Sequence, residues 1–231
     1  MKTKIFCDIA DLKIINKFNK KVLVKGFTTN PSLMRKAGAK DYESYAKKIL
    51  KICKKPLSLE VFGDDYHSMK MQALKINSWG KNVYVKIPVV NSKGLFMGKL
   101  IKELSEKKIK LNITAVYSAS QTKKVLKNIN KKSKIIISIF VGRSADTGKD
   151  PVPEIKKSIS LSKNFKNVEI LWASVREPYN FTQAKQIGCQ IITVPPSIIE
   201  KIEKFGKSFE FLTKETVKNF LKDSKKSKFK I

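Results

Sequence analysis

Short apolar runs alternate along the chain with longer segments in which apolar residues recur every three or four positions. The runs predict buried β-strands, and the periodic segments predict amphipathic helices. Strands are expected at 5–8, 22–24, 57–61, 83–88, 110–114, 135–141, 169–173 and 190–194. Helices are expected at 11–18, after the polar loop 27–33, and at 41–53, 68–79, 94–106, 118–127, 151–162, 180–187, 196–205 and 213–223.

This order predicts a single (β/α)8 TIM barrel domain over residues 1–231, in which residues 213–231 form an additional C-terminal helix and a basic tail. Strands that alternate with helices pair in parallel through right-handed crossovers, and a chain of this length suits a barrel. The alternative is an open doubly wound sheet. The chain has neither the G-x-G-x-x-G nor the P-loop pattern that such sheets often carry.

One predicted strand, Val83-Tyr84-Val85-Lys86-Ile87-Pro88, carries a lysine near its C-terminal end among apolar residues. Burial of an amine disfavours its charged form, which suits a Schiff-base nucleophile. Pro88 ends the strand, because it cannot donate to a continuing ladder. Lysine is so common in this chain that this position alone is weak support for catalysis.

The positive charge comes almost wholly from lysine. Of 49 lysine and arginine residues only Arg35, Arg143 and Arg176 are arginine, and with 19 acidic residues the formal charge is +30. Such a charge suggests nucleic-acid binding, and a non-catalytic barrel that binds RNA is a remote alternative. The lysines are spread along the whole chain, and no recognition motif accompanies them. We therefore expect no nucleic-acid partner and a field that attracts small anions.

Other features narrow the possible settings. Cys7, Cys53 and Cys189 are too scattered to suggest a disulfide frame or a metal site, and His67 lies in no catalytic motif and is interpreted as a surface or capping residue. No apolar run is long enough to span a bilayer, and residues 1–8 lack the apolar core of a signal peptide. We expect a cytoplasmic protein without a membrane partner.

Polar residues recur where predicted strands end, which is where barrel enzymes keep their chemistry. A lysine can form an imine with a ketone, and a carboxylate can move the proton of a hydroxyl beside the breaking C–C bond. Arginines at the rim can hold a phosphate. The combination indicates a class I aldol site for a phosphorylated sugar. The candidate residues are Asp8, Asn30, Glu60, Lys86, Asn112, Thr114, Ser138, Phe140, Arg143, Ser174 and Arg176.

All of these residues except Glu60 lie in segments that resemble the transaldolase family, in the short-chain branch that also includes fructose-6-phosphate aldolase. The resemblance runs from Phe6 to about Ile199. Its most specific segments are Thr28-Thr29-Asn30-Pro31-Ser32-Leu33 and Val85-Lys86-Ile87-Pro88. The others are Phe6-Cys7-Asp8, Asn112-Ile113-Thr114, Ser138-Ile139-Phe140-Val141-Gly142-Arg143, Ala173-Ser174-Val175-Arg176 and Thr193-Val194-Pro195-Pro196.

The resemblance implies a class I aldolase-type barrel without cofactor or metal. It implies that Lys86 is the Schiff-base lysine, that Asp8 is the acid/base acting on the substrate C4 hydroxyl, and that Glu60 and Thr114 hold the water of imine chemistry. The other implied roles concern substrate: Asn30 and Asn112 bind the dihydroxyacetone part with Ser138, Phe140 and Ser174 nearby, while Arg143, Arg176 and Ser174 hold the phosphate.

Two positions bear on the reaction within this family. The aldolase subgroup is expected to carry glutamine and tyrosine where this chain has Glu60 and Phe140, so the resemblance favours transaldolase of the pentose phosphate pathway. An aldolase that releases free dihydroxyacetone is the alternative. The turn that starts at Glu177 departs from the family pattern, and we expect it to weaken phosphate binding or alter acceptor choice. The resemblance also implies a homo-oligomer, such as a decamer, built with the C-terminal helix.

Overall fold

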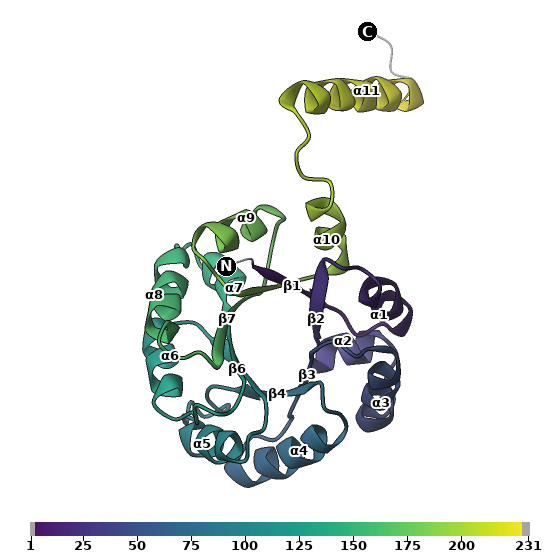
Figure 1. The fold of residues 1–231 in the computed structure, drawn as a ribbon. Helices are drawn as coiled ribbons and strands as arrows, with labels where there is room; N and C mark the ends of the chain where they lie inside the picture. Colours follow the sequence, from purple (N-terminus) through teal and green to yellow (C-terminus); the bar gives the residue numbers. More distant parts are fainter. Residues whose placement is uncertain (1–2, 228–231) are drawn as a thin grey trace.

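The computed structural model describes residues 3–227 and contains a closed parallel barrel in the order β1 to β8. All the described helices except the last surround the barrel (Figure 1). The predicted (β/α)8 barrel is therefore confirmed. The strands are β1 (Lys4–Asp8), β2 (Val24–Thr28), β3 (Leu57–Glu60), β4 (Val83–Pro88), β5 (Leu111–Val116), β6 (Ile135–Phe140), β7 (Val168–Ala173) and β8 (Ile191–Val194).

Side-chain caps fix where several helices begin. Asp11, Asn30, Asp41, Asp65 and Ser118 each accept a hydrogen bond from the backbone N–H three residues on, which satisfies one of the free donors of the first turn. The helices are α1 (Leu12–Asn19), α2 (Pro31–Lys36), α3 (Tyr42–Ile52), α4 (Tyr66–Ser78), α5 (Gly98–Glu106), α6 (Ala119–Leu126), α7 (Val141–Ala145), α8 (Val152–Ser162), α9 (Tyr179–Gln186), α10 (Pro196–Ile202) and α11 (Phe209–Ser227).

Apolar side chains form two layers on the two sides of the barrel wall. The larger layer lies between the strands and the helices, and it contains fully buried residues such as Ile87, Ile113 and Ile137. A smaller cluster, which we place inside the barrel, contains Phe6, Tyr84, Ile136, Leu171, Ala173 and Ile191. Since side chains alternate along each strand, the inward set of each strand continues toward the C-terminal end into the polar candidates.

The second strand differs from the prediction at both ends. Val22 is 82% exposed and lies outside β2, whereas Phe27 and Thr28, expected in a loop, belong to the strand. Gly26 resembled a strand end but lies inside β2, opposite Phe6. A Cβ at Gly26 would stand 2.6 Å from the Phe6 ring, so only glycine leaves room for this aromatic side chain.

Other predicted boundaries were also wrong. α5 begins at Gly98 rather than at residue 94, because Val90 and Phe96 first form an antiparallel bridge. The short α7 was not predicted at all. α10 ends at Ile202, and α11 is longer than expected in both directions. His67 is an exposed residue of α4, as interpreted from the sequence.

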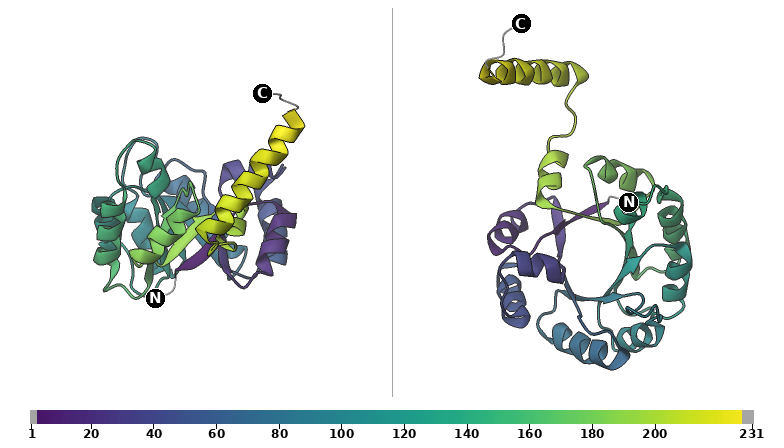
Figure 2. Two further views of the ribbon diagram at one scale, coloured as in Figure 1. Left: turned by 90° about the horizontal axis from the view of Figure 1, so that it is seen from above. Right: turned by 180° about the vertical axis from the view of Figure 1, so that it is seen from behind.

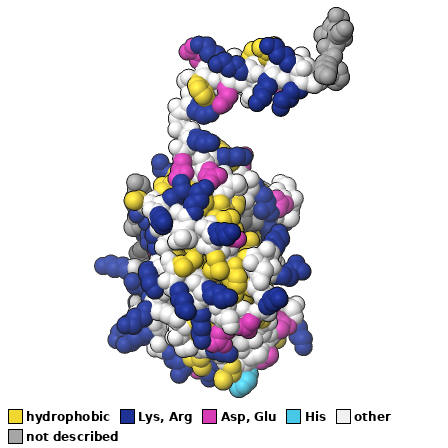
Figure 3. Space-filling view, turned by 90° about the vertical axis from the view of Figure 1, so that its right-hand side faces the viewer, with side chains coloured by type: hydrophobic (Ala, Val, Ile, Leu, Met, Phe, Trp, Pro, Cys, Tyr) yellow, Lys and Arg dark blue, Asp and Glu magenta, His cyan; other side chains and the backbone are white. Residues whose placement is uncertain are grey.

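The last helix stands away from the barrel (Figures 1 and 2). None of its described residues is buried, and Phe209, Val217, Phe220 and Leu221 expose apolar side chains. The expected basic tail overlaps the end of α11, which runs to Ser227, and its remaining residues, 228–231, lie outside the described residues. Lysine and arginine side chains are spread over the face of the molecule seen in Figure 3. Within the described part of the chain, no helix combines the length and apolar character needed to cross a membrane.

Candidate active site

The C-terminal ends of the strands surround a cavity of about 210 Å³. Most of the polar residues that the sequence placed at strand ends meet there, although they come from six different strands and the loops that follow. Glu60 and Asn112 do not line the cavity directly but contact residues that do. The lining residues are Asp8, Thr28, Asn30, Lys86, Thr114, Ser138, Phe140, Arg143, Ala173, Ser174, Arg176 and Thr193.

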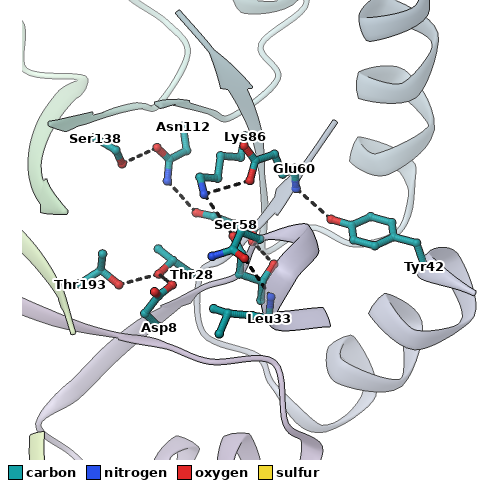
Figure 4. A network of polar contacts seen from close by, with 12 residues as sticks. Asp8, Thr28, Leu33, Tyr42, Ser58, Glu60, Lys86, Asn112, Ser138 and Thr193 are labelled. Atoms are coloured by element: carbon teal, nitrogen blue, oxygen red, sulfur yellow. Dashed lines mark hydrogen bonds and ion pairs between the residues drawn. The ribbon is translucent and has the colours of Figure 1, made fainter. Parts of the chain in front are cut away.

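Lys86 points into the barrel from β4 and is 8% exposed. Its Nζ atom lies 3.1 Å from Glu60 Oε2 and donates to the Thr29 carbonyl at 3.2 Å (Figure 4). Glu60 pairs with Lys86 in the register of β3 and β4, so the two inward side chains lie side by side. The amine is thus sheltered, held by two oxygen acceptors, and still open to the cavity.

Glu60 is anchored from outside the barrel. Its backbone N–H donates to the hydroxyl of Tyr42 at 2.9 Å, and Tyr42 comes from α3. Burial raises the pKa of that phenol, so it remains a neutral hydroxyl. Tyr42 packs edge-on against Phe62 with ring centroids 4.5 Å apart. This contact fixes the end of β3 and therefore the carboxylate beside Lys86.

Asp8 ends β1 and is held by the hydroxyl of Thr28, which is itself in contact with the hydroxyl of Thr193. Thr28 donates to Asp8 Oδ1 at 2.6 Å, and the Thr28 and Thr193 oxygens lie 2.5 Å apart. Because Thr28 has a single hydroxyl proton, Thr193 is the donor in that second bond when Asp8 is ionised. Burial raises the pKa of Asp8, and the Thr28 bond and the charge of Lys86 lower it by less.

Asn112 lies beneath the cavity and is 0% exposed. Its amide donates to Ser58 Oγ at 3.0 Å and accepts from Ser138 Oγ at 2.7 Å, which links strands β3, β5 and β6. Two residues further along β5, the hydroxyl of Thr114 is buried and has no hydrogen-bond partner among the described residues. Thr114 lines the cavity, so this hydroxyl can hold a water or a substrate atom.

The two arginines at the rim are held differently. The Arg143 guanidinium lies 5.3 Å from the centroid of the Phe140 ring, and Phe140 in turn contacts Tyr117. Arg176 binds Asp146 with two nitrogens, one of which is Nε at 3.0 Å. This pair lowers the pKa of Asp146. Arg176 therefore has a carboxylate partner, whereas the described residues give Arg143 none.

A close backbone contact joins the two arginine segments. Ser174 has a positive φ of 63°, and its Oγ accepts a hydrogen bond from the Arg143 N–H at 3.1 Å. A Cβ at Gly142 would lie 1.6 Å from the Ser174 carbonyl oxygen, so residue 142 must be glycine for this contact. The contact sets where both arginines leave the backbone.

The remaining candidates have local structural contacts as well. Asn30 caps α2 by accepting from the Leu33 N–H at 2.9 Å, while its side chain borders the cavity. The Glu177 backbone N–H donates to Asn180 Oδ1 at 3.3 Å. Among the described residues, Asp146 is the acidic partner of Arg176, and Glu177 forms no ion pair.

Several residues of this site are not among the candidates that the sequence indicates. The sequence pattern predicts a loop at Thr28, but the residue lies two positions after Gly26 in β2 and points inward with it. Thr193 belongs to a segment that resembles the family, and its inward position follows from the alternation of β8. Ser58, Tyr42 and Asp146 carry no local signal, because their roles depend on contacts with residues distant in the chain.

The closed eight-stranded parallel barrel, with a sheltered lysine and two carboxyl groups at its C-terminal mouth, has the architecture of a TIM-barrel enzyme. The family model described as Transaldolase/Fructose-6-phosphate aldolase matches residues 5–231. The chain therefore belongs to the transaldolase/fructose-6-phosphate aldolase family, as the sequence segments indicated.

Similar proteins span nearly the same length. A probable transaldolase from Nitrosopumilus maritimus is 37% identical over 227 residues, covering 97% of this chain and 96% of that protein. Another, from a Sulfurihydrogenibium species, is 38% identical over 224 residues and covers 95% of both chains. A third, from Thermoplasma volcanium, is 36% identical over 226 residues and covers 96% of both.

Solved structures that resemble this one share its fold at low identity. KGPDC from Streptococcus mutans has a TM-score of 0.58 at 12% identity, with 87% of this chain and 91% of that chain covered. N-acetylneuraminate lyase from Mycoplasma synoviae has a TM-score of 0.56 at 12% identity, with coverages of 83% and 68%. These likenesses show the barrel alone.

Proposed function

We propose that this protein is a transaldolase. It transfers a dihydroxyacetone unit from sedoheptulose 7-phosphate or fructose 6-phosphate to glyceraldehyde 3-phosphate or erythrose 4-phosphate. The observation that carries the proposal is the sheltered amine of Lys86 between Glu60 and the cavity that Asp8 borders. Family membership supports the same chemistry.

The reaction begins when the neutral amine of Lys86 attacks the C2 carbonyl of the donor ketose. Glu60, 3.1 Å from Nζ, is placed to take the proton that the ammonium must lose. The carbinolamine then expels water and becomes an iminium ion. We assign the handling of that water to Glu60 and to the free hydroxyl of Thr114.

Asp8 performs the proton transfer of the C–C step. Its carboxylate removes the proton of the C4 hydroxyl, the C3–C4 bond breaks, and the electron pair moves into the iminium to give an enamine. The aldehyde fragment leaves, and the acceptor aldehyde then takes its place. The raised pKa of Asp8 suits a group that accepts a proton and returns it within one cycle.

The remaining residues bind the substrate in this proposal. The amides of Asn30 and Asn112 hold the dihydroxyacetone hydroxyls, and Ser138, Phe140 and Ser174 complete that part of the cavity. The amide of Asn112 has a second N–H besides the one donated to Ser58. Arg143 and Arg176 hold the phosphate, and Ser174 positions the Arg143 backbone.

A lysine-trapping experiment tests the imine step. Borohydride added with fructose 6-phosphate should fix a covalent adduct to the peptide that contains Lys86, as seen by mass spectrometry. Lys86→Met should remove adduct and turnover while keeping the fold, because methionine suits the volume of the site. Lys13→Met, at an exposed position, serves as the control. An adduct on any other lysine contradicts the assignment.

A coupled assay separates transfer from cleavage. With erythrose 4-phosphate present, fructose 6-phosphate should yield glyceraldehyde 3-phosphate and sedoheptulose 7-phosphate. Without an acceptor, an aldolase would release free dihydroxyacetone continuously, and a transaldolase would stop after one turnover. Continuous release would establish the alternative within the same family.

We also propose that the protein assembles with further copies of itself, and that α11 makes the contact. The helix exposes Phe209, Val217, Phe220 and Leu221, which a soluble monomer would leave in water. The barrel is complete without it. A helix of 19 residues, none of them buried in the single chain, is suited to pack on another subunit.

A further inference from the structure

A second cavity lies at the opposite end of the barrel. It has a volume of about 980 Å³ and is lined by the residues at which the strands begin. Lys4 and Phe6 come from β1, Tyr84 comes from β4, and Glu169 comes from β7. This N-terminal cleft is separated from the candidate active site by the buried residues that fill the barrel.

Lysine dominates the wall of the N-terminal cleft. Its single lining carboxylate, Glu169, is already paired with Lys4 at 2.6 Å. None of the other lining lysines has an acidic partner among the described residues, in contrast to Lys21 and Lys70 elsewhere on the barrel. Seven lysines therefore face one cleft with a net charge of about +6. They are Lys4, Lys25, Lys131, Lys132, Lys134, Lys163 and Lys166.

The cleft also has an apolar wall, unlike a simple patch of surface charge. Ile159, from α8, and Phe165, just after that helix, line it and are only half-buried. Phe6, Tyr84 and Ile136 form its floor and are almost fully buried. A ligand that fits such a cleft carries several negative charges at one end and a flat apolar group at the other.

We propose that the N-terminal cleft binds a nucleoside triphosphate. Its phosphate chain would lie among Lys131, Lys132 and Lys134 on one side and Lys163 and Lys166 on the other. Its base would lie against Ile159 and Phe165. The cavity volume is within the range of small-molecule sites, about 300–1,000 Å³. Inorganic polyphosphate shares the charge but leaves the apolar wall uncovered.

Calorimetric titration of the full-length protein tests this with three ligands, ATP, tripolyphosphate and adenosine, without divalent metal and at low salt. ATP should bind once per chain and at least tenfold more tightly than tripolyphosphate, and adenosine should bind weakly. Phe165→Leu keeps an apolar side chain but removes the ring, so it should bring ATP close to tripolyphosphate. If both anions bind wild type equally, the base is not recognised and the proposal is wrong.

Charge reversal tests the location. The double variant Lys132→Glu and Lys166→Glu should weaken ATP binding at least tenfold. The control Lys13→Glu and Lys156→Glu changes the net charge equally at exposed positions outside the cleft and should weaken it less than twofold. If both double variants lose ATP affinity equally, ATP responds to the overall positive charge of the protein, and the proposed site in the N-terminal cleft is wrong.

Chemical protection gives a measurement on the unaltered chain. ATP should slow the acetylation of Lys132, Lys134 and Lys166 while leaving Lys13 and Lys156 unaffected. The protection should be identical when Lys86 carries a borohydride-fixed adduct, because the two cavities lie at opposite ends of the barrel. Uniform protection of all five lysines would contradict a cleft that binds one nucleotide.

Discussion

At the scale of single residues, the buried carboxyl group of Asp8, the proposed acid/base, is held by the hydroxyl of Thr28, which contacts Thr193 in turn. Burial raises its pKa, and the hydrogen bond from Thr28 at 2.6 Å opposes that rise. Thr28→Val removes the bond at nearly constant volume, so the pKa of Asp8 should move higher. The acidic limb of the pH profile of kcat/KM should then shift to higher pH.

The variant Thr193→Val supplies the matched control. It removes the donor to Thr28 but leaves the bond from Thr28 to Asp8. The acidic limb of its pH profile should therefore also shift to higher pH, but by less than in Thr28→Val. The measurement is the pH profile of kcat/KM for both variants over the acidic range. If the acidic limb moves to lower pH in Thr28→Val, the titration of Asp8 does not determine that limb.

The same carboxyl group affects stability. A pKa that is raised in the folded state favours folding below the ordinary value of 3.8, and this contribution is lost as the pH rises. Asp8→Asn removes the buried charge, so it should raise the melting temperature at pH 7. This gain over wild type should become smaller as the pH falls, because Asp8 itself then becomes neutral. Thermal melts across the acidic range measure this. Borohydride trapping should still work in this variant, while C–C cleavage slows.

Glu60 and Phe140 test which branch of the family this chain follows. Glu60→Gln should slow formation and release of the adduct, because the amide cannot accept the proton from Lys86. Phe140→Tyr places a proton donor at the cavity, which should favour protonation of the enamine and release of dihydroxyacetone. The ratio of free dihydroxyacetone to transfer product should rise in Phe140→Tyr. If the variant is folded and this ratio is unchanged, Phe140 does not determine the choice between transfer and cleavage.

At the scale of elements, α7 and the end of β7 form one unit that carries both rim arginines. Arg143→Ala and Arg176→Ala should each raise KM for phosphorylated substrates, by roughly 10- to 100-fold if the lost bond is worth about 1.5–3 kcal/mol. Arg143→Ala should be the more severe, because Arg176 already shares its charge with Asp146. An unphosphorylated acceptor should be affected little. Equal losses for both acceptors would exclude a phosphate role.

The close contact within this unit gives a stability prediction. Gly142→Ala would place a Cβ 1.6 Å from the Ser174 carbonyl, so the backbone must shift. We expect a loss of about 1–3 kcal/mol in the free energy of unfolding, measured by urea titration. Gly80→Ala meets only movable side chains, the nearest at 3.2 Å, and should cost less. If the two variants lose similar free energies of unfolding, the backbone around Gly142 and Ser174 relaxes freely and the close contact does not constrain it.

The sequence predicted elements better than the contacts between them. Strand ends rich in polar residues are local signals, so the sequence alone predicts that Lys86, Glu60 and Thr114 lie toward the ends of their strands, where the structure places them. The second strand was misplaced because Gly26 looks like a terminator, and its true reason lies in the Phe6 ring on another strand. Asp146 was missed because its partner is 30 residues away in the chain.

At the scale of the whole molecule, α11 is the helix whose described residues are all exposed. Removal of residues 208–231 should leave the barrel folded, since none of the described residues of α11 is buried. We expect the full-length protein to be a homo-oligomer and the truncated protein to contain fewer subunits per particle. Light scattering measures both. A full-length protein that is monomeric in solution would contradict the proposed role of the helix.

The first and last strands of the barrel pair directly, Lys4 with Ile191 and Cys7 with Val194. During synthesis the N-terminal strands appear first, so the sheet stays open until β8 has been made. An open sheet exposes unpaired backbone groups at its edges, and long-range pairing forms slowly. Throughout that stage, repulsion between chains that carry a formal charge of +30 when complete opposes their edge-to-edge aggregation.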